Sequence, residues 1–172
     1  MSQKSQQLLN TEWSQSGAEF SRGKLWRYAL WREWARPTLD TTIAFIGLNP
    51  STADATTNDP TVTRCINFAK QWGFARMLML NAYALRSTDP KGLWQAADPI
   101  GPDNDAALKR YASQAALHVV CWGVNCRSDR ERAVLEVLSR PVYCLGTTSF
   151  GRPKHPLYLK NETQLERFQS AR

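Results

Sequence analysis

The chain has 172 residues, of which 42% are hydrophobic and 22% charged, so one globular domain is expected and a disordered or fibrous chain is excluded. Lysine and arginine outnumber aspartate and glutamate by 22 to 15, and residues 109–172 alone carry 11 basic and 5 acidic side chains. Such a basic segment indicates either a polyanionic partner, nucleic acid or a nucleotide, or a solvated basic surface.

The N-terminal part of the chain predicts one edge strand and one buried strand. Residues 1–20 are polar and are expected to be frayed, which leaves residues 21–172 as a single α/β domain. Residues 25–34 are rich in aromatic side chains and predict an edge strand. Residues 42–46 form a continuous apolar run, which is typical of a strand buried on both faces.

The rest of the chain alternates between helical and apolar strand patterns. Helices are expected over residues 58–73, 103–116 and 128–139, with a last short helix capped by Asn161, and strands over residues 77–80, 117–122 and 142–145. Strands and helices that alternate in this way form parallel sheets with right-handed crossovers. The sequence therefore predicts a three-layer α/β/α domain, with a mostly parallel four-stranded central sheet plus an N-terminal edge strand.

Polar residues follow the predicted strands where ligands bind in such sheets, at the carboxyl ends. The Asn49 carboxamide is suited to hold a water or a ligand amide, or to stabilise its own turn. Asn81 ends the next strand and is suited to read a base edge or to act as a structural turn residue. His155, in a basic loop, either stabilises a developing oxyanion or is a surface histidine.

Charged residues near these positions complete the candidate set. Asp54 has no capping role to explain it, unlike Asp59, and is the better candidate for a carboxylate that activates water. Three basic residues follow the later strands on the expected ligand side and are candidates for phosphate binding: Arg127, Arg152 and Lys154. The chain contains neither a phosphate-binding P-loop nor a dinucleotide fingerprint, so these two enzyme classes are not expected.

Four short motifs resemble, in order, those of the uracil-DNA glycosylase superfamily. They are Gly47-Leu-Asn-Pro50, Met77-Leu-Met-Leu-Asn81-Ala, Val120-Cys-Trp-Gly123 and His155-Pro-Leu157. The chain as a whole more closely resembles a small bacterial and phage family of unknown function. That closer resemblance is carried by the stretches Arg27-Tyr-Ala-Leu-Trp-Arg32, Gly47-Leu-Asn-Pro-Ser-Thr-Ala-Asp54, Asn58-Asp-Pro-Thr61 and His155-Pro-Leu-Tyr158.

The resemblance to the glycosylases implies a flipped base in a pocket at the carboxyl edge of the sheet. In that arrangement Asn49 positions the attacking water, Asn81 reads the base and His155 stabilises negative charge on the departing base. The strongest members of the superfamily have Asp where Asn49 stands, so Asp54 would have to supply the carboxylate. The remaining residues assigned to the base pocket are Gly47, Pro50, Tyr83 and Trp122.

The resulting expectation is a nucleobase-recognising protein that hydrolyses the N-glycosidic bond of a modified or mismatched base. Two alternatives remain open: a nucleic-acid or nucleotide binder without catalysis, and a nucleotide-processing hydrolase or transferase that uses a divalent metal through Asp54 and Asp59. The expected partner is a nucleic acid, with DNA favoured over RNA, or a free nucleotide.

Four cysteines without a C-x-x-C spacing and two histidines predict no metal site and no cofactor. No apolar run suits a membrane span and no secretory signal is evident, so a cytoplasmic monomer without a membrane partner is expected.

Overall fold

Parallel strands make up the centre of the sheet, and each is a short run of mostly buried apolar residues. The computed structural model describes residues 15–170. In it, β3 (Thr42–Gly47) pairs in parallel with β4 (Arg76–Asn81) on one side and with β5 (Leu117–Val120) on the other, and β5 pairs in parallel with β6 (Tyr143–Cys144). These are the four central strands that the sequence predicts.

The whole sheet has seven strands, so the expected four strands and one edge strand describe only part of it. Its order is β1-β2-β4-β3-β5-β6-β7. Here β1 (Gln15–Phe20), β2 (Arg27–Glu33) and β7 (Glu166–Arg167) are antiparallel to their neighbours. The predicted edge strand is β2, but it is not an edge because β1, within the predicted polar segment, pairs with its outer side. The other part of that segment, residues 1–14, lies outside the described residues.

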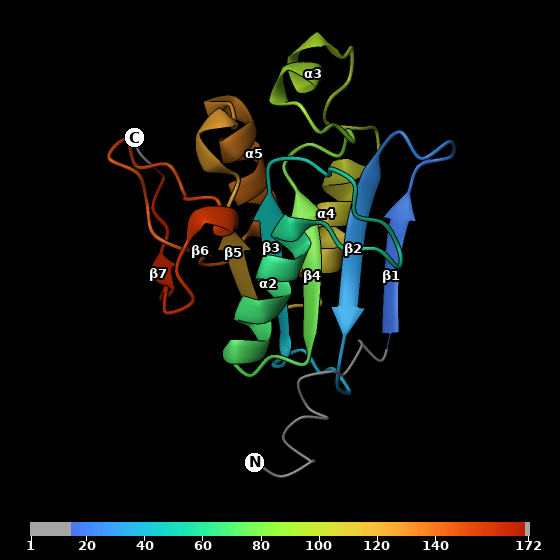
Figure 1. Cartoon of the computed structure of the whole chain (residues 1–172). Helices are drawn as coiled ribbons and strands as arrows, with labels where there is room; N and C mark the ends of the chain where they lie inside the picture. The colour runs from blue at the N-terminus through green and yellow to red at the C-terminus, as the bar shows by residue number, and fades with distance from the viewer. Residues whose placement is uncertain (1–14, 171–172) are drawn as a thin grey trace.

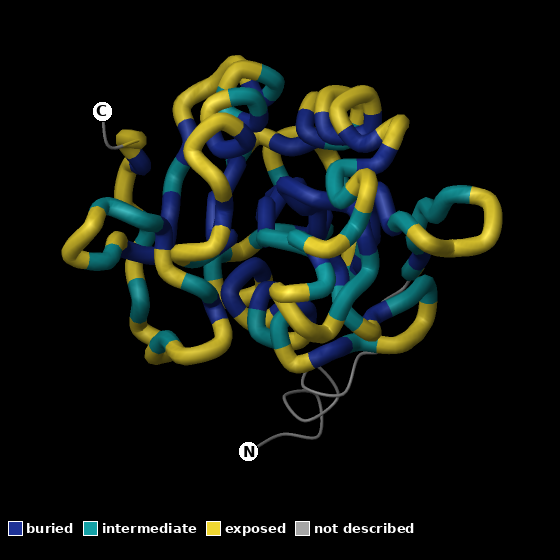
Figure 2. The backbone as a smooth tube through the Cα atoms, turned by 90° about the horizontal axis from the view of Figure 1, so that it is seen from above, coloured by how far each residue is buried: buried dark blue, intermediate teal, exposed yellow. Residues whose placement is uncertain are grey.

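Helices cover both faces of the sheet (Figure 1). On one face, α2 (Pro60–Gln71) packs its apolar side against alternate residues of the central strands, such as Phe45 and Met77. On the other face, α4 (Asn104–Ala112) and α5 (Ser128–Leu138) pack against the intervening residues, such as Ala44 and Leu78. Figure 2 shows that the buried chain is surrounded by exposed loops and exposed outer sides of helices.

Four shorter elements differ from the sequence expectation or refine it. A short helix, α3 (Pro90–Gln95), begins at a proline after an Asp89 cap, within a stretch expected to be a loop. One 3-10 turn, η1 (Gly123–Asn125), follows β5, and a second, η2 (Pro156–Tyr158), follows the basic loop. The last short helix is absent from residues 161–170, where β7 instead pairs with β6, so that prediction was wrong.

Two buried arginines of β2 fix the loop that follows β3. Arg32 donates from Nη2 to the carbonyl oxygen of Asp54 at 2.7 Å and from Nε to Asn58 Oδ1 at 2.9 Å. Arg27 donates from Nη1 to the carbonyl oxygen of Ala53 at 2.8 Å. Hydrogen bonds from charged donors are among the stronger ones in proteins, so this loop is held against β2 before the chain enters α2.

The buried His118 of β5 makes stability depend on pH. Its Nε2 donates to the carbonyl oxygen of Ala112 at 2.8 Å, its Nδ1 has no partner among the described residues, and burial lowers its pKa below the ordinary value of 6.5. The neutral ring is therefore favoured in the folded state. Stability is fully present above pH 6.5 and is lost as the pH falls toward the folded-state pKa, because the unfolded chain binds the proton more readily.

We predict that the free energy of unfolding falls between about pH 7.5 and about pH 5, and that His118→Gln flattens this slope. Glutamine keeps an N–H donor for Ala112 but does not titrate. Urea denaturation at several pH values measures the effect. An equal slope in the wild type and the variant would contradict the assignment to His118.

Candidate functional site

A cavity of about 450 Å³, here called the edge cavity, lies where β3 and β5 end. Because both strands run parallel, the segments that follow them leave from the same edge of the sheet. Four parts of the chain supply most of its wall: the turn after β3, the first turn of α2, the turn after β5 and the segment before α3. The lining side chains and backbone that matter below are those of Arg27, Gly47, Asn49, Ser51, Asp59, Thr61, Ser87, Thr88, Trp122, His155 and Tyr158.

Asp59 brings a carboxylate to the edge cavity from the start of α2. Its Oδ1 accepts the backbone N–H of Val62 at 2.8 Å, which is the helix cap that the sequence predicts. Asp59 is 9% exposed and also lines the cavity. The residue that caps α2 therefore also belongs to the wall of the cavity.

His155 lines the same cavity as a neutral imidazole with an N–H to donate. Its Nδ1 accepts the backbone N–H of Leu157 at 3.3 Å, so the ring proton lies on Nε2. Burial lowers the pKa of His155 below its ordinary value, and the negative charge of Asp59 opposes this shift. Within the described part of the chain Nε2 makes no hydrogen bond, so it remains able to donate to a ligand.

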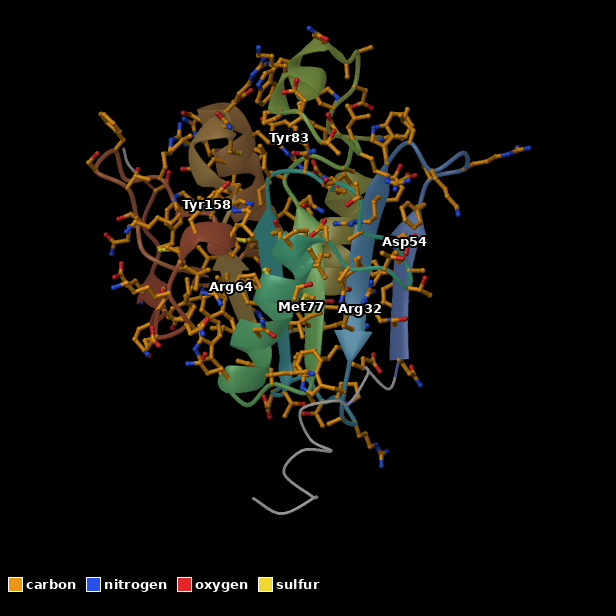
Figure 3. The ribbon with its side chains drawn as sticks, viewed as in Figure 1. Arg32, Asp54, Arg64, Met77, Tyr83 and Tyr158 are labelled. Atoms are coloured by element: carbon orange, nitrogen blue, oxygen red, sulfur yellow. The ribbon has the colours of Figure 1, made fainter. Side chains whose placement is uncertain are left out.

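The turn that carries His155 is held against α2 (Figure 3). Arg64 of α2 donates to the carbonyl oxygen of Leu159 and to Oδ1 of Asn161. The Tyr158 ring lies beside His155, with 6.4 Å between the ring centroids, and is 86% exposed at the cavity wall. The cavity thus has an exposed aromatic ring at one side.

Trp122 forms a second aromatic part of the wall and is almost fully buried. Its Nε1 donates to Glu131 Oε2 at 3.2 Å, and its ring packs edge-on against Phe168. The indole is therefore fixed in orientation. Because Trp122 is only 1% exposed, it closes the cavity wall and leaves little ring surface for a ligand.

Asn49 lines the cavity, but its amide nitrogen is committed to the backbone. Nδ2 lies 2.9 Å from the carbonyl oxygen of Ser87, 3.0 Å from that of Pro50 and 3.4 Å from that of Leu85. Asn49 therefore joins the turn after β3 to the segment after β4. Only its Oδ1 is left to face a ligand.

Asn81 is not part of the cavity wall. It is fully buried, and neither amide atom has a hydrogen-bond partner among residues 15–170. Gly47 lies against it: a Cβ at Gly47 would be 3.2 Å from Asn81 Oδ1 and 2.7 Å from Met79 Cε. Gly47 itself lines the cavity, so the structure does not bring Asn81 to the place where Asn49 and His155 meet.

Asp54 also lies outside the wall of the edge cavity. Its Oδ1 accepts the backbone N–H groups of Thr56 at 2.9 Å and Thr57 at 2.7 Å, and these bonds hold its pKa below the ordinary value. Figure 3 shows Asp54 beside β1 and β2, on the other side of the view from Tyr158. Its carboxylate therefore has a structural task in the loop.

Tyr83 and Pro50, assigned to the base pocket, are absent from the cavity wall. Tyr83 is buried, packs edge-on against Trp94 with 5.4 Å between centroids, and accepts the backbone N–H of Arg127 at 3.4 Å. Pro50 is buried, and its carbonyl oxygen accepts the backbone N–H of Ser87. Both hold neighbouring segments together.

The three basic residues assigned to phosphate binding also lie outside the cavity wall. Arg152 pairs with Glu131, with 2.7 Å between Nη1 and Oε2, and lines a separate hollow beside α5. The guanidinium of Arg127 lies 4.4 Å from the centroid of the Trp94 ring. Lys154 is exposed and its stem packs over Gly146.

Sequence reasoning did not assign Arg27 to the site, and it gave Asp59 a capping role and, in one alternative, a metal-binding role, yet both residues line the cavity. The signal for Arg27 was a charged residue inside a strand pattern of buried residues, which is rare without a partner.

Among residues 15–170 no group of three or more histidine, cysteine, aspartate or glutamate side chains is arranged to hold a metal ion. None of the described helices is long and apolar enough to cross a membrane.

Fold and site together define an α/β protein with a small cavity at the carboxyl edge of its sheet. Residues 27–157 match the family described as "protein of unknown function (DUF1643)", and the chain belongs to that family. This confirms the closer of the two resemblances. No curated protein and no solved structure matches the chain significantly, and nothing in these comparisons supports the resemblance to the glycosylases.

The hydrogen bonds of Asn49 predict that Asn49→Asp is destabilising. A carboxylate cannot donate, so it would face the carbonyl oxygens of Pro50, Leu85 and Ser87 without a proton between them. We expect a loss of about 1–3 kcal/mol in the free energy of unfolding, measured by urea denaturation. An Asn49→Asp variant as stable as the wild type would show that the carboxamide does not clamp these segments.

Proposed function

We propose that the chain binds a nucleobase in the edge cavity and hydrolyses its N-glycosidic bond. The observation that carries this proposal is that the carboxylate of Asp59 and the donating imidazole of His155 line one cavity. Hydrolysis of such a bond needs a base for the attacking water and a donor for the departing ring, and these groups have the two properties.

Asp59 is the group that accepts the proton from water. Its Oδ1 is occupied by the Val62 N–H, while Oδ2 accepts no hydrogen bond within the described residues. In the reaction, water adds to the anomeric carbon and passes a proton to Asp59. The electron pair of the broken C–N bond goes to the base.

His155 stabilises the negative charge that develops on the departing base. A neutral imidazole that accepts Leu157 N–H on Nδ1 points its remaining N–H away from that bond. The depressed pKa of His155 keeps this neutral form populated at neutral pH. Asn49 Oδ1 lies in the same wall and is suited to orient the water.

The rest of the cavity suits a planar ring. Its volume of about 450 Å³ lies within the range of small-molecule sites, roughly 300–1,000 Å³. Tyr158 supplies an exposed aromatic ring at its wall, and such rings stack on bases without strong sequence preference. These features support a nucleobase over an aliphatic substrate.

The matched pair Asp59→Asn and Asp54→Asn tests the assignment. Asparagine caps helices as well as aspartate does, so Asp59→Asn keeps α2 while removing the proton acceptor. We expect a loss of base release of about 10²–10⁴-fold for Asp59→Asn. Asp54→Asn retains an oxygen for Thr56 and Thr57 and is expected to stay near wild-type activity.

Base release is measured by chromatography, from oligonucleotides with uracil, mismatched or modified bases and from free nucleotides. Equal activity of Asp59→Asn and the wild type would contradict the role of Asp59. Salt-sensitive binding of these substrates without release of any base would contradict hydrolysis and leave a nucleotide-binding protein without catalysis.

A further inference from the structure

Arg27 is a buried cation in the wall of the edge cavity. The residue is 1% exposed, and its Nη1 donates to the carbonyl oxygen of Ala53. Its Nε has no hydrogen-bond partner among residues 15–170, and no ion pair described for this part of the chain includes it. A buried guanidinium of this kind is costly unless an anion approaches it.

The charges around Arg27 do not balance. Arg32 and Arg86 are close enough to repel it, and Asp54 and Asp59 are close enough to attract it. Three guanidinium groups therefore face two carboxylates, each of which already accepts backbone N–H groups. Burial lowers the pKa of Arg27 to about 10, so the group stays charged at neutral pH.

Further donors lie in the wall that Arg27 shares. Thr61 belongs to the first turn of α2, where backbone N–H groups have no acceptor within the helix and anions are favoured. Two further hydroxyl side chains line the cavity as well, those of Ser51 and Thr88. An arginine, a helix start and hydroxyl groups form a set of donors that suits a phosphate.

We propose that Arg27 binds a phosphate group of the ligand, so that the substrate is a nucleotide rather than a free base or a nucleoside. This inference rests on the proposed function, which supplies the base in the same cavity. It differs from the sequence prediction, which placed phosphate binding on Arg127, Arg152 and Lys154, outside the wall.

Calorimetric titration of the wild type with a nucleoside monophosphate and with the matching nucleoside tests the subsite. We expect the monophosphate to bind at least about tenfold more tightly. Arg27→Gln should abolish that difference and leave the affinity for the nucleoside unchanged. Arg27→Lys keeps the charge without the planar fork and should retain part of the difference.

Arg127→Gln is the matched control because it removes an arginine that lies outside the edge cavity, and it should keep the full preference for the monophosphate. If Arg27→Gln does not fold, thermal melts of the wild type provide a second test. Inorganic phosphate should raise its melting temperature and compete with the monophosphate, while Arg27→Lys should show a smaller rise. Equal affinities for nucleoside and monophosphate, or a difference that survives in Arg27→Gln, would overturn the subsite.

A short oligonucleotide without terminal phosphates separates the two sources of the group. Tighter binding of the monophosphate assigns the subsite to a free nucleotide, whereas tighter, Arg27-dependent binding of the oligonucleotide assigns it to a phosphate within a strand. Base release without any effect of the phosphate would sink the subsite and leave the proposed function standing. Arg27-dependent phosphate binding without base release would support the subsite and contradict the proposed hydrolysis.

Discussion

The parallel pairing of β3 with both β4 and β5 is the constraint on which the site depends. Ile46 of β3 is level with Leu80 of β4 and with Val120 of β5, so all three strands end at one edge. The turns that follow them must leave from that edge. Because β2 is antiparallel to β4, its first residue, Arg27, arrives at the same place.

The strands that the sequence predicts well are those whose own apolar residues favour burial. Continuous apolar runs such as β3 cannot be left in water and are buried wherever they lie. By contrast, β1 and β7 are mostly polar or exposed, and they are strands only because β2 and β6 offer an unpaired edge. That information lies in the neighbouring strand, so local patterns do not contain it.

The same reasoning explains which site residues could be predicted. Asn49, His155 and Trp122 were found because each follows a strand end or lies in the last long loop, and all three line the edge cavity. Position along a strand does not say which atoms cover a side chain, so the burial of Asn81 behind Gly47 was not foreseen. The helix-capping role of Asp59 did not indicate that this residue also lines a cavity.

The edge cavity gathers charges that folding alone does not favour. Burying Arg27 and Arg32 beside the loop after β3 costs solvation, and their hydrogen bonds to backbone carbonyls recover part of it. Proteins retain such arrangements where a ligand uses them, and strongly perturbed groups gather at functional sites. In this chain the buried arginine, the capping aspartate and the neutral histidine share one wall.

A crystal structure of the protein soaked with a nucleoside monophosphate tests this account most directly. The account predicts the base between Asp59 and His155, with its ring against Tyr158 and its phosphate within hydrogen-bond distance of Arg27. A nucleotide bound elsewhere, for instance in the hollow beside Arg152, with the edge cavity left to water, would contradict it.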